Sequence, residues 1–168
     1  PEIRDAWIGG HRVDEPEGKA LWTSYLQVGA HAPPKLQPLI AQLAAVIVFD
    51  VLIDNPDRWT GNNAKGSVDR RTLYFMDNTL SFSLFTFGHK NNLDPLFKIE
   101  VFPRRLVDRL RAPAPAAITA AIDVGDDPLG PLLTAPEITA MLGRRDHLLA
   151  YIDGLIAEYG EANVLGLP

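Results

Sequence analysis

The stretch "LIAQLAAVIVFDVLIDNPDRWTGNN", residues 39–63, decides the fold. Its first part is a nearly unbroken apolar run, and its second part is a sudden cluster of Asp, Asn, Arg and Gly. A second polar cluster lies in "YFMDNTLSF", residues 74–82. The two clusters place Asp57, Asn62 and Asp77 just past the ends of two apolar elements, which raises the question of what these side chains do there.

The composition is that of an ordinary soluble domain. A chain of 168 residues is long enough for one domain with its own core. Apolar residues make up 46% and charged residues 22%, which is typical of globular proteins and sets no class apart. The net charge of −5 argues against nucleic-acid binding, because no broad basic surface is available to meet phosphates. The local pairs Arg104-Arg105 and Arg144-Arg145 fall in helical patterns, so we expect them on solvated faces.

The chain has no cysteines, which excludes disulfides and thiolate metal sites. The compartment stays open between cytoplasm and secretion, although no signal peptide is visible. The longest apolar run, residues 39–53, contains Gln42 and Asp50 and is short for a membrane span, so we expect no transmembrane segment. Since the first residue is Pro1, we expect a fragment, a processed product or the ordered part of a longer protein. The Ala-, Arg-, Leu- and Pro-rich composition indicates a bacterial source with a GC-rich genome.

The apolar run predicts a long buried helix over residues 35–55. Apolar side chains recur at helical spacing from Leu36 onward, and the opposite face is also apolar. A helix that is apolar nearly all round is buried on most sides. Pro56 is expected to end it. The preceding residues 1–34 are rich in Gly, Pro and charge, which predicts an irregular lead-in with short elements.

The rest of the chain predicts a hairpin followed by helices. A strand starting at Asn62 and a second in "TLYFMD", joined by the turn-rich "GSVDRR", read as a β-hairpin within residues 56–82. Residues 78–95 are apolar-aromatic but broken by polar residues, so we expect an ordered, irregular segment. Residues 103–160 form a helical tail, whose last helix starts at a Thr134/Glu137 capping box. The fold class is therefore a single, mostly helical α+β domain.

The two polar clusters carry the residue types of phosphoryl transfer. Asp57 and Asp77 are carboxylates and Asn62 offers a neutral oxygen, which are ligands that Mg²⁺ prefers. In phosphoryl transfer one Asp positions the attacking hydroxyl, while an Asn and a second Asp hold metal ions. The spacing from Asp57 to Asn62 is the Asp-x-x-x-x-Asn spacing of a protein-kinase catalytic loop. The hairpin would bring Asp77 back beside them.

On these residues the chain resembles the atypical kinases of the phosphatidylinositol 3-/4-kinase-like superfamily. Type II phosphatidylinositol 4-kinases have a D-R-x-x-x-N loop and a later D-N-G. The secretory-pathway casein kinase and four-jointed group has N-x-D-R and D-N-G, and HipA-type bacterial kinases have N-x-D-x-x-x-x-N. Here "NPDR" is the N-x-D-R element, and "DNT" stands where those families have D-N-G or D-F-G.

The resemblance implies a bilobal kinase-like fold, of which this chain would be the large (C-terminal) lobe with its small catalytic hairpin. It implies that Asp57 and Arg58 serve catalysis, Arg58 as a loop-ordering residue, and that Asn62 and Asp77 bind the metal and the nucleotide. Asp50 would brace the loop. ATP and Mg²⁺ or Mn²⁺ would be the cofactors, and a hydroxyl of a protein, sugar or lipid would be the acceptor.

Two departures from the family pattern stand out. Thr79 replaces the usual Gly, which reduces backbone freedom at that point. The segment before Asp57 is also short for a β-rich small lobe with a phosphate-binding Lys, and Lys19 in "EGKALW" lacks a strand-like setting. The small lobe is therefore expected to be absent from this chain and is a possible separate partner.

Several alternatives stay open at the level of sequence. Asp and Asn also occur at such sites as helix caps and turn formers. Asn63 could replace Asn62 as a ligand, because the phase of the hairpin decides which side chain points inward. Asp54 is expected in a polar stripe, and Trp59 either packs the loop or touches substrate. A kinase-derived binding or regulatory module without turnover, or an unrelated helical domain with a chance motif, would carry the same residues.

Overall fold

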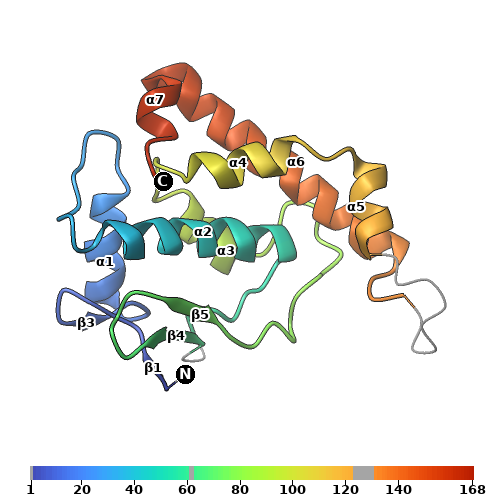
Figure 1. Cartoon of the computed structure of the whole chain (residues 1–168). Coiled ribbons are helices and arrows are strands. Elements are labelled where there is room, and N and C mark those ends of the chain that lie inside the picture. Colours follow the sequence, from blue (N-terminus) through green and yellow to red (C-terminus); the bar gives the residue numbers. More distant parts are fainter. Residues whose placement is uncertain (1, 61–62, 123–130) are drawn as a thin grey trace.

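The computed structural model describes residues 2–60, 63–122 and 131–168 and shows an α+β domain of helices and small antiparallel sheets (Figure 1). In chain order the elements are β1 (Ile3–Asp5), β2 (Trp7–Ile8), β3 (His11–Arg12), α1 (Pro16–Tyr25), α2 (Gln37–Ile53), β4 (Ala64–Ser67), β5 (Leu73–Phe75), α3 (Lys90–Leu96), α4 (Arg104–Arg111), α5 (Pro115–Ile122), α6 (Ala135–Tyr159) and α7 (Glu161–Val164). The expected α+β class is confirmed.

The central element is α2, the predicted buried helix. Apolar side chains on nearly all its faces are buried, as the run of residues 39–53 predicts. Figure 1 shows it between the small sheet and α6, and it contacts β5 on one side and α6 on another. The helix covers Gln37–Ile53 and not the predicted residues 35–55. It ends before Pro56 because Asp54, one of the few residue types that do so readily, adopts the left-handed conformation (φ 58°). The polar loop therefore leaves α2 from a fixed point in the core.

The predicted hairpin is present as β4 and β5. The pair is antiparallel, with Lys65 opposite Tyr74 and Gly66 opposite Leu73. A third strand, β1, pairs with the other edge of β4, so the three-stranded sheet has the order β1-β4-β5. The N-terminal segment thus completes the sheet that carries the second polar cluster.

The lead-in of residues 1–34 is more regular than expected. Besides the strands, it contains α1, whose first position is Pro16, where the missing N–H is no loss. The buried Trp22 holds the helix to the sheet side, because its indole Nε1 donates to the carbonyl of Val13 at 2.9 Å. The expectation of an irregular segment fails here because Trp22 and its partner form one packed unit with the core.

The segment after β5 follows the expectation only in part. The structure has no helix or strand from residue 76 to 89, but α3 begins at Lys90. The Nδ1 atom of His89 accepts from the backbone N–H of Asn91 at 3.1 Å and caps the helix. Pro95 lies inside this helix, near its end, and does not prevent it.

Within the predicted helical tail, residues 103–160, the structure has α4, α5 and α6, and residues 123–130 lie outside its described part. The capping box of α6 is formed: the Thr134 hydroxyl accepts from the N–H of Glu137 at 3.5 Å, and the Glu137 carboxylate accepts from the N–H of Thr134 at 2.6 Å. Gly160 ends the helix with φ 86°. Among the described residues, none of the helices combines the length and hydropathy that a membrane crossing requires.

One expectation about charge is wrong. Arg144, predicted on a solvated face of α6, has no exposed surface. Its guanidinium donates to the carbonyls of Leu52, Ser83 and Phe85 at 3.0, 3.0 and 2.7 Å. The reason is that residues 83–89 have no ladder of their own, so an arginine from α6 satisfies their carbonyl groups.

Candidate functional site

The loop that follows α2 is held by a buried ion pair. Arg58 has no exposed surface, and its Nε and Nη2 atoms lie 3.1 and 3.0 Å from the two carboxylate oxygens of Asp50. Asp50 comes from the last part of α2, so the pair fixes the loop onto the end of the helix. The expected contact between Asp50 and the loop is therefore present.

The same arginine reaches the second polar cluster. Its Nη1 donates to the carbonyl of Met76, and its Nη2 donates to the side-chain oxygen of Asn78 at 2.6 Å. Arg58 thus ties the end of α2, the polar loop and the segment after β5 to one another. The resemblance implies a loop-ordering role for Arg58, and that role stays a prediction.

A buried asparagine adds a second bridge between the clusters. The Oδ1 of Asn55 accepts from the backbone N–H of Asp57 at 3.1 Å, and its Nδ2 donates to the backbone carbonyl of Asp77 at 3.0 Å. One side chain therefore spans the two chain segments that carry the two carboxylates. We call Asp50, Asn55, Arg58 and Asn78 the loop tether.

The role of Asn55 was not predicted. The available signal was its place as the first residue of "NPDR", but nothing in the sequence shows which distant backbone its amide would reach. The hairpin fold supplies that partner, since β4 and β5 return the chain to the end of α2.

The Asp57 carboxylate is oriented by its own loop. Its Oδ1 accepts from the Thr60 hydroxyl at 2.6 Å, and its Oδ2 accepts from the side-chain amide of Asn63 at 3.0 Å. Asn62, the predicted metal ligand, lies outside the described residues. Of the two open alternatives, Asn63 is the one whose described side chain meets Asp57.

Asp77 presents an exposed carboxylate from a left-handed backbone position (φ 54°). The hydroxyl and backbone N–H of Thr79 donate to its Oδ1 at 2.6 and 3.3 Å. These hydrogen bonds lower the pKa of Asp77, so the group is negatively charged at neutral pH. The left-handed residue of "DNT" is thus the Asp itself, a residue type that tolerates this conformation. Thr79, which stands where the kinase families have Gly, has a negative φ, so this position does not require a glycine.

Burial changes the pKa of Asp50, the member of the loop tether that lies on α2. Loss of hydration raises the pKa of Asp50 to about 6, while the hydrogen bonds and the charge of Arg58 act to lower it. The ion pair therefore only partly offsets the cost of taking the carboxylate out of water.

The metal-binding capacity of the described residues is limited. Among residues 2–60, 63–122 and 131–168 there is no group of three or more His, Asp and Glu that could hold an ion by itself. The carboxylate of Asp77 and the amide oxygen of Asn63 are each of a type that Mg²⁺ or Mn²⁺ binds, but no described contact brings the two together.

Asp54 belongs to a separate, structural cluster. It was expected in a polar stripe, but the structure buries it. Its carboxylate accepts from the Ser83 hydroxyl, from the N–H of His89 at 2.6 Å and from the side-chain amide of Asn92 at 2.9 Å. The expectation fails because these partners come from a segment remote in sequence. With all these donors, Asp54 anchors the chain rather than facing a ligand.

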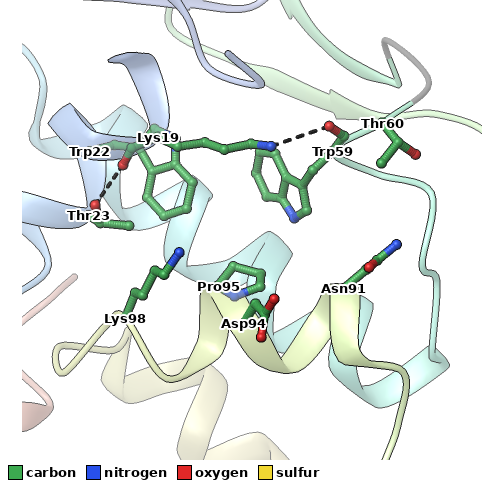
Figure 2. A pocket seen from close by; sticks show the side chains of 9 residues that line it. All are labelled: Lys19, Trp22, Thr23, Trp59, Thr60, Asn91, Asp94, Pro95 and Lys98. Atoms are coloured by element: carbon green, nitrogen blue, oxygen red, sulfur yellow. Dashed lines mark hydrogen bonds between the residues drawn. The ribbon is translucent and has the colours of Figure 1, made fainter. Parts of the chain in front are cut away.

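A cavity of about 230 Å³ lies on the other side of the loop, between α1 and α3 (Figure 2). Its lining residues are Lys19, Trp22, Thr23, Trp59, Thr60, Asn91, Asp94, Pro95 and Lys98. The rings of Trp22 and Trp59 pack with centroids 5.4 Å apart, and the Lys19 Nζ donates to the carbonyl of Trp59 at 3.3 Å. Trp59 therefore packs the loop against α1, one of its two expected roles.

Comparison with known proteins gives no family assignment. A scan against protein-family models found no match, and a search of curated proteins found no similar protein. The kinase hypothesis therefore depends on the residues and contacts of this chain.

Proposed function

We propose that this chain is the large-lobe portion of an ATP- and metal-dependent phosphotransferase of the atypical kinase type. The acceptor would be a hydroxyl group of a protein, sugar or lipid. The observation that carries the proposal is the Asn55 bridge, in which one buried side chain joins the backbones of Asp57 and Asp77. A pair of turns that only capped their own elements would not need to be joined in this way.

In this mechanism Asp57 is the residue that meets the acceptor. Its carboxylate, oriented by Thr60 and Asn63, would accept a hydrogen bond from the acceptor hydroxyl and take its proton as that oxygen bonds to the γ-phosphorus of ATP. The bond between the γ-phosphorus and the bridging oxygen breaks in the same step, and ADP leaves with the electron pair. Positioned proton transfer of this kind contributes about 10²–10⁴-fold to a rate. Arg58 would act through the loop, because its guanidinium is buried and donates to Asp50, Met76 and Asn78.

Asp77 would hold the cation, with Asn63 or Asn62 as the second protein ligand. When bound, Mg²⁺ or Mn²⁺ would supply positive charge to the phosphate oxygens. The chain's own contribution is an exposed carboxylate oriented by Thr79, on a segment whose backbone Asn55 joins to the Asp57 loop.

A second candidate is a kinase-derived binding or regulatory module without turnover. The observation that favours it is that each oxygen of the Asp57 carboxylate already accepts a hydrogen bond from Thr60 or Asn63. The carboxylate could then serve the loop alone, as a turn former. The two candidates differ in whether ATP is consumed.

The test is Mn²⁺-dependent release of ADP from ATP, measured in the full-length protein. We expect Asp57→Asn and Asp77→Asn each to lower the rate at least about 100-fold, with melting temperatures close to that of the wild type. Asp69→Asn is the matched control, since Asp69 is an exposed turn residue in the same hairpin and its loss should leave the rate unchanged.

Full activity in the Asp57→Asn/Asp77→Asn double variant would end the proposal. Nucleotide binding by a wild-type protein that never releases ADP would favour the binding module.

A further inference from the structure

We propose that the cavity between α1, the Trp59 loop and α3 binds a small organic anion. On the proposed function, this anion is the acceptor substrate or part of it. The binding claim stands on the cavity alone, and only its assignment as acceptor site rests on the kinase proposal.

The charges around the cavity favour an anion. Lys19 approaches from α1, Lys98 approaches from just past α3, and Figure 2 shows both side chains bordering the same space. Asp94 is the one acidic residue among the lining residues, so the lining carries an excess of positive charge. Burial lowers the pKa of Lys19; the negative charge of Asp14 acts against that lowering, and the positive charge of Lys98 adds a smaller lowering. Two ammonium groups that repel each other are stabilised when an anion lies between them.

An unsatisfied donor points to an acceptor atom on the ligand. Trp59 is only 8% exposed, and its indole Nε1 has no hydrogen-bond partner within the described parts of the chain. In Figure 2 this nitrogen lies on the side of the ring that faces α3, across the cavity. Trp22 differs, because its Nε1 donates to Val13. A buried N–H without a partner costs about 1–3 kcal/mol. Because the nitrogen atom itself is buried, a ligand oxygen would remove that cost after a small rotation of the Trp59 ring toward the cavity.

The shape and walls limit the size of the ligand. The rings of Trp22 and Trp59 and the ring of Pro95 supply apolar surfaces, and Asn91 and Asp94 supply polar groups for hydroxyls. A volume of about 230 Å³ is below the roughly 300–1,000 Å³ of sites for drug-sized molecules. The ligand is therefore small, of the size of a single sugar ring, and carries a carboxylate or a phosphate group.

The cavity is next to the residue that would receive the acceptor's proton. Thr60 lines the cavity, and its hydroxyl donates to the Asp57 carboxylate at 2.6 Å. Asp57 itself does not line the cavity, so Thr60 would be the link between a bound anion and the Asp57 carboxylate.

The experiment follows the indole N–H signals of the ¹⁵N-labelled chain, which has three tryptophans. The Trp59 signal is assigned with Trp59→Phe, and the probes are gluconate, glucose 6-phosphate, inorganic phosphate and uncharged glucose. We expect the Trp59 signal to move saturably with gluconate or with glucose 6-phosphate, and the Trp7 signal to stay in place. Which of the two moves it separates a carboxylate from a phosphate ligand. Equal binding of glucose, equal binding of inorganic phosphate, or no movement with any probe would overturn the proposal.

Charge variants test the location. Lys98→Gln should weaken binding of the effective probe at least about tenfold, and Lys98→Arg should retain most of it. Lys90→Gln is the matched control, because it removes the same charge from an exposed position on α3. An equal loss with Lys90→Gln would show a general charge effect and contradict the site.

The outcome is separable from that of the proposed function. Asp57→Asn should abolish phosphate transfer and leave the Trp59 shift intact. Transfer by a protein that binds none of the anions would sink the cavity proposal alone, whereas binding without any transfer would sink the kinase proposal alone.

Discussion

Two arginines with no exposed surface, Arg58 and Arg144, hold the end of α2 in different ways. Arg58 pairs directly with the carboxylate of Asp50 and reaches the Asp77 segment. Arg144 donates only to backbone carbonyls in the part of the structure described, and one of its terminal nitrogens has no partner there. Burial lowers the pKa of Arg144, and the charge of Asp54 acts against that lowering.

We infer that Arg144 has a purely structural role, which we call the clamp, whereas Arg58 is part of the loop tether at the candidate site. The contacts of Arg144 hold the irregular residues 83–89 to α2 and α6. This segment is not part of a helix or sheet, so its backbone carbonyl groups need hydrogen-bond donors from elsewhere. The tether around Arg58 joins the two segments whose side chains could bind a metal and a hydroxyl. If this assignment is right, the same substitution at the two positions should affect stability and function differently.

The largest effect is expected for Arg58→Met. The change leaves the Asp50 carboxylate buried without its partner, which costs about 3–5 kcal/mol in the free energy of unfolding. It also removes the donors to Met76 and Asn78, so ATP turnover should fall. Urea unfolding measures the loss, with Arg109→Met on the exposed face of α4 as control, where a change below about 0.5 kcal/mol is expected. A loss no greater than that of the control would refute the tether.

A smaller effect is expected for Arg144→Met. It leaves the carbonyls of Leu52, Ser83 and Phe85 without a donor, at a cost of about 1–3 kcal/mol in the free energy of unfolding. Hydrogen exchange should speed up around residues 83–89, while the proposed ATP turnover should persist. If Arg144→Met abolished turnover as fully as Arg58→Met, the division into clamp and tether would be wrong.

The smallest expected effect is on two pKa values within the site, which are shifted in opposite directions. The Asp50 carboxylate should titrate near pH 6, above its ordinary value of 3.8, and Asp77 below its ordinary value. Because the folded state holds the Asp50 proton more tightly, that group adds stability as the pH falls from about 6 toward 3.8. The contribution of Asp77 is present above its ordinary pKa and is lost as the pH falls through its lowered one.

Carbon-13 NMR of the side-chain carboxylates measures both midpoints. Arg58→Met should raise the Asp50 midpoint further, since Arg58 acts to lower it, and Thr79→Val should move the Asp77 midpoint up toward its ordinary value. Unchanged midpoints in both variants would mean that these contacts do not set the charges.

The sequence predicted the elements whose signals are local. The apolar run of α2, the turn-rich connection between β4 and β5 and the capping box of α6 each lie within one stretch of chain. It did not predict α1 as a separate helix. It also missed the pairing of β1 with β4, because that pairing joins segments some sixty residues apart, with Asp5 opposite Lys65. Local composition carries no information about such a partner.

The candidate site shows the same limit. The types and spacing of Asp57 and Asp77 were readable, but the Asn55 bridge depends on where the hairpin returns. The burial of Asp54 and Arg144 could not be read either, since their partners lie in residues 83–92, a segment without a clear pattern in its first part. Asp54 stands directly after an apolar run in the sequence, which is the only local sign of burial. Whether such a residue is buried depends on the packing of the folded chain.

The most direct test of the central claim is paramagnetic broadening by Mn²⁺ in the ¹⁵N-labelled chain, with and without a non-hydrolysable ATP analogue. The account predicts that the amide signals of Asp57, Asn63 and Asp77 broaden together, only when the nucleotide is present, and that Asp77→Asn removes the effect. Broadening that is independent of nucleotide, or that spares either the Asp57 or the Asp77 segment, would contradict the account.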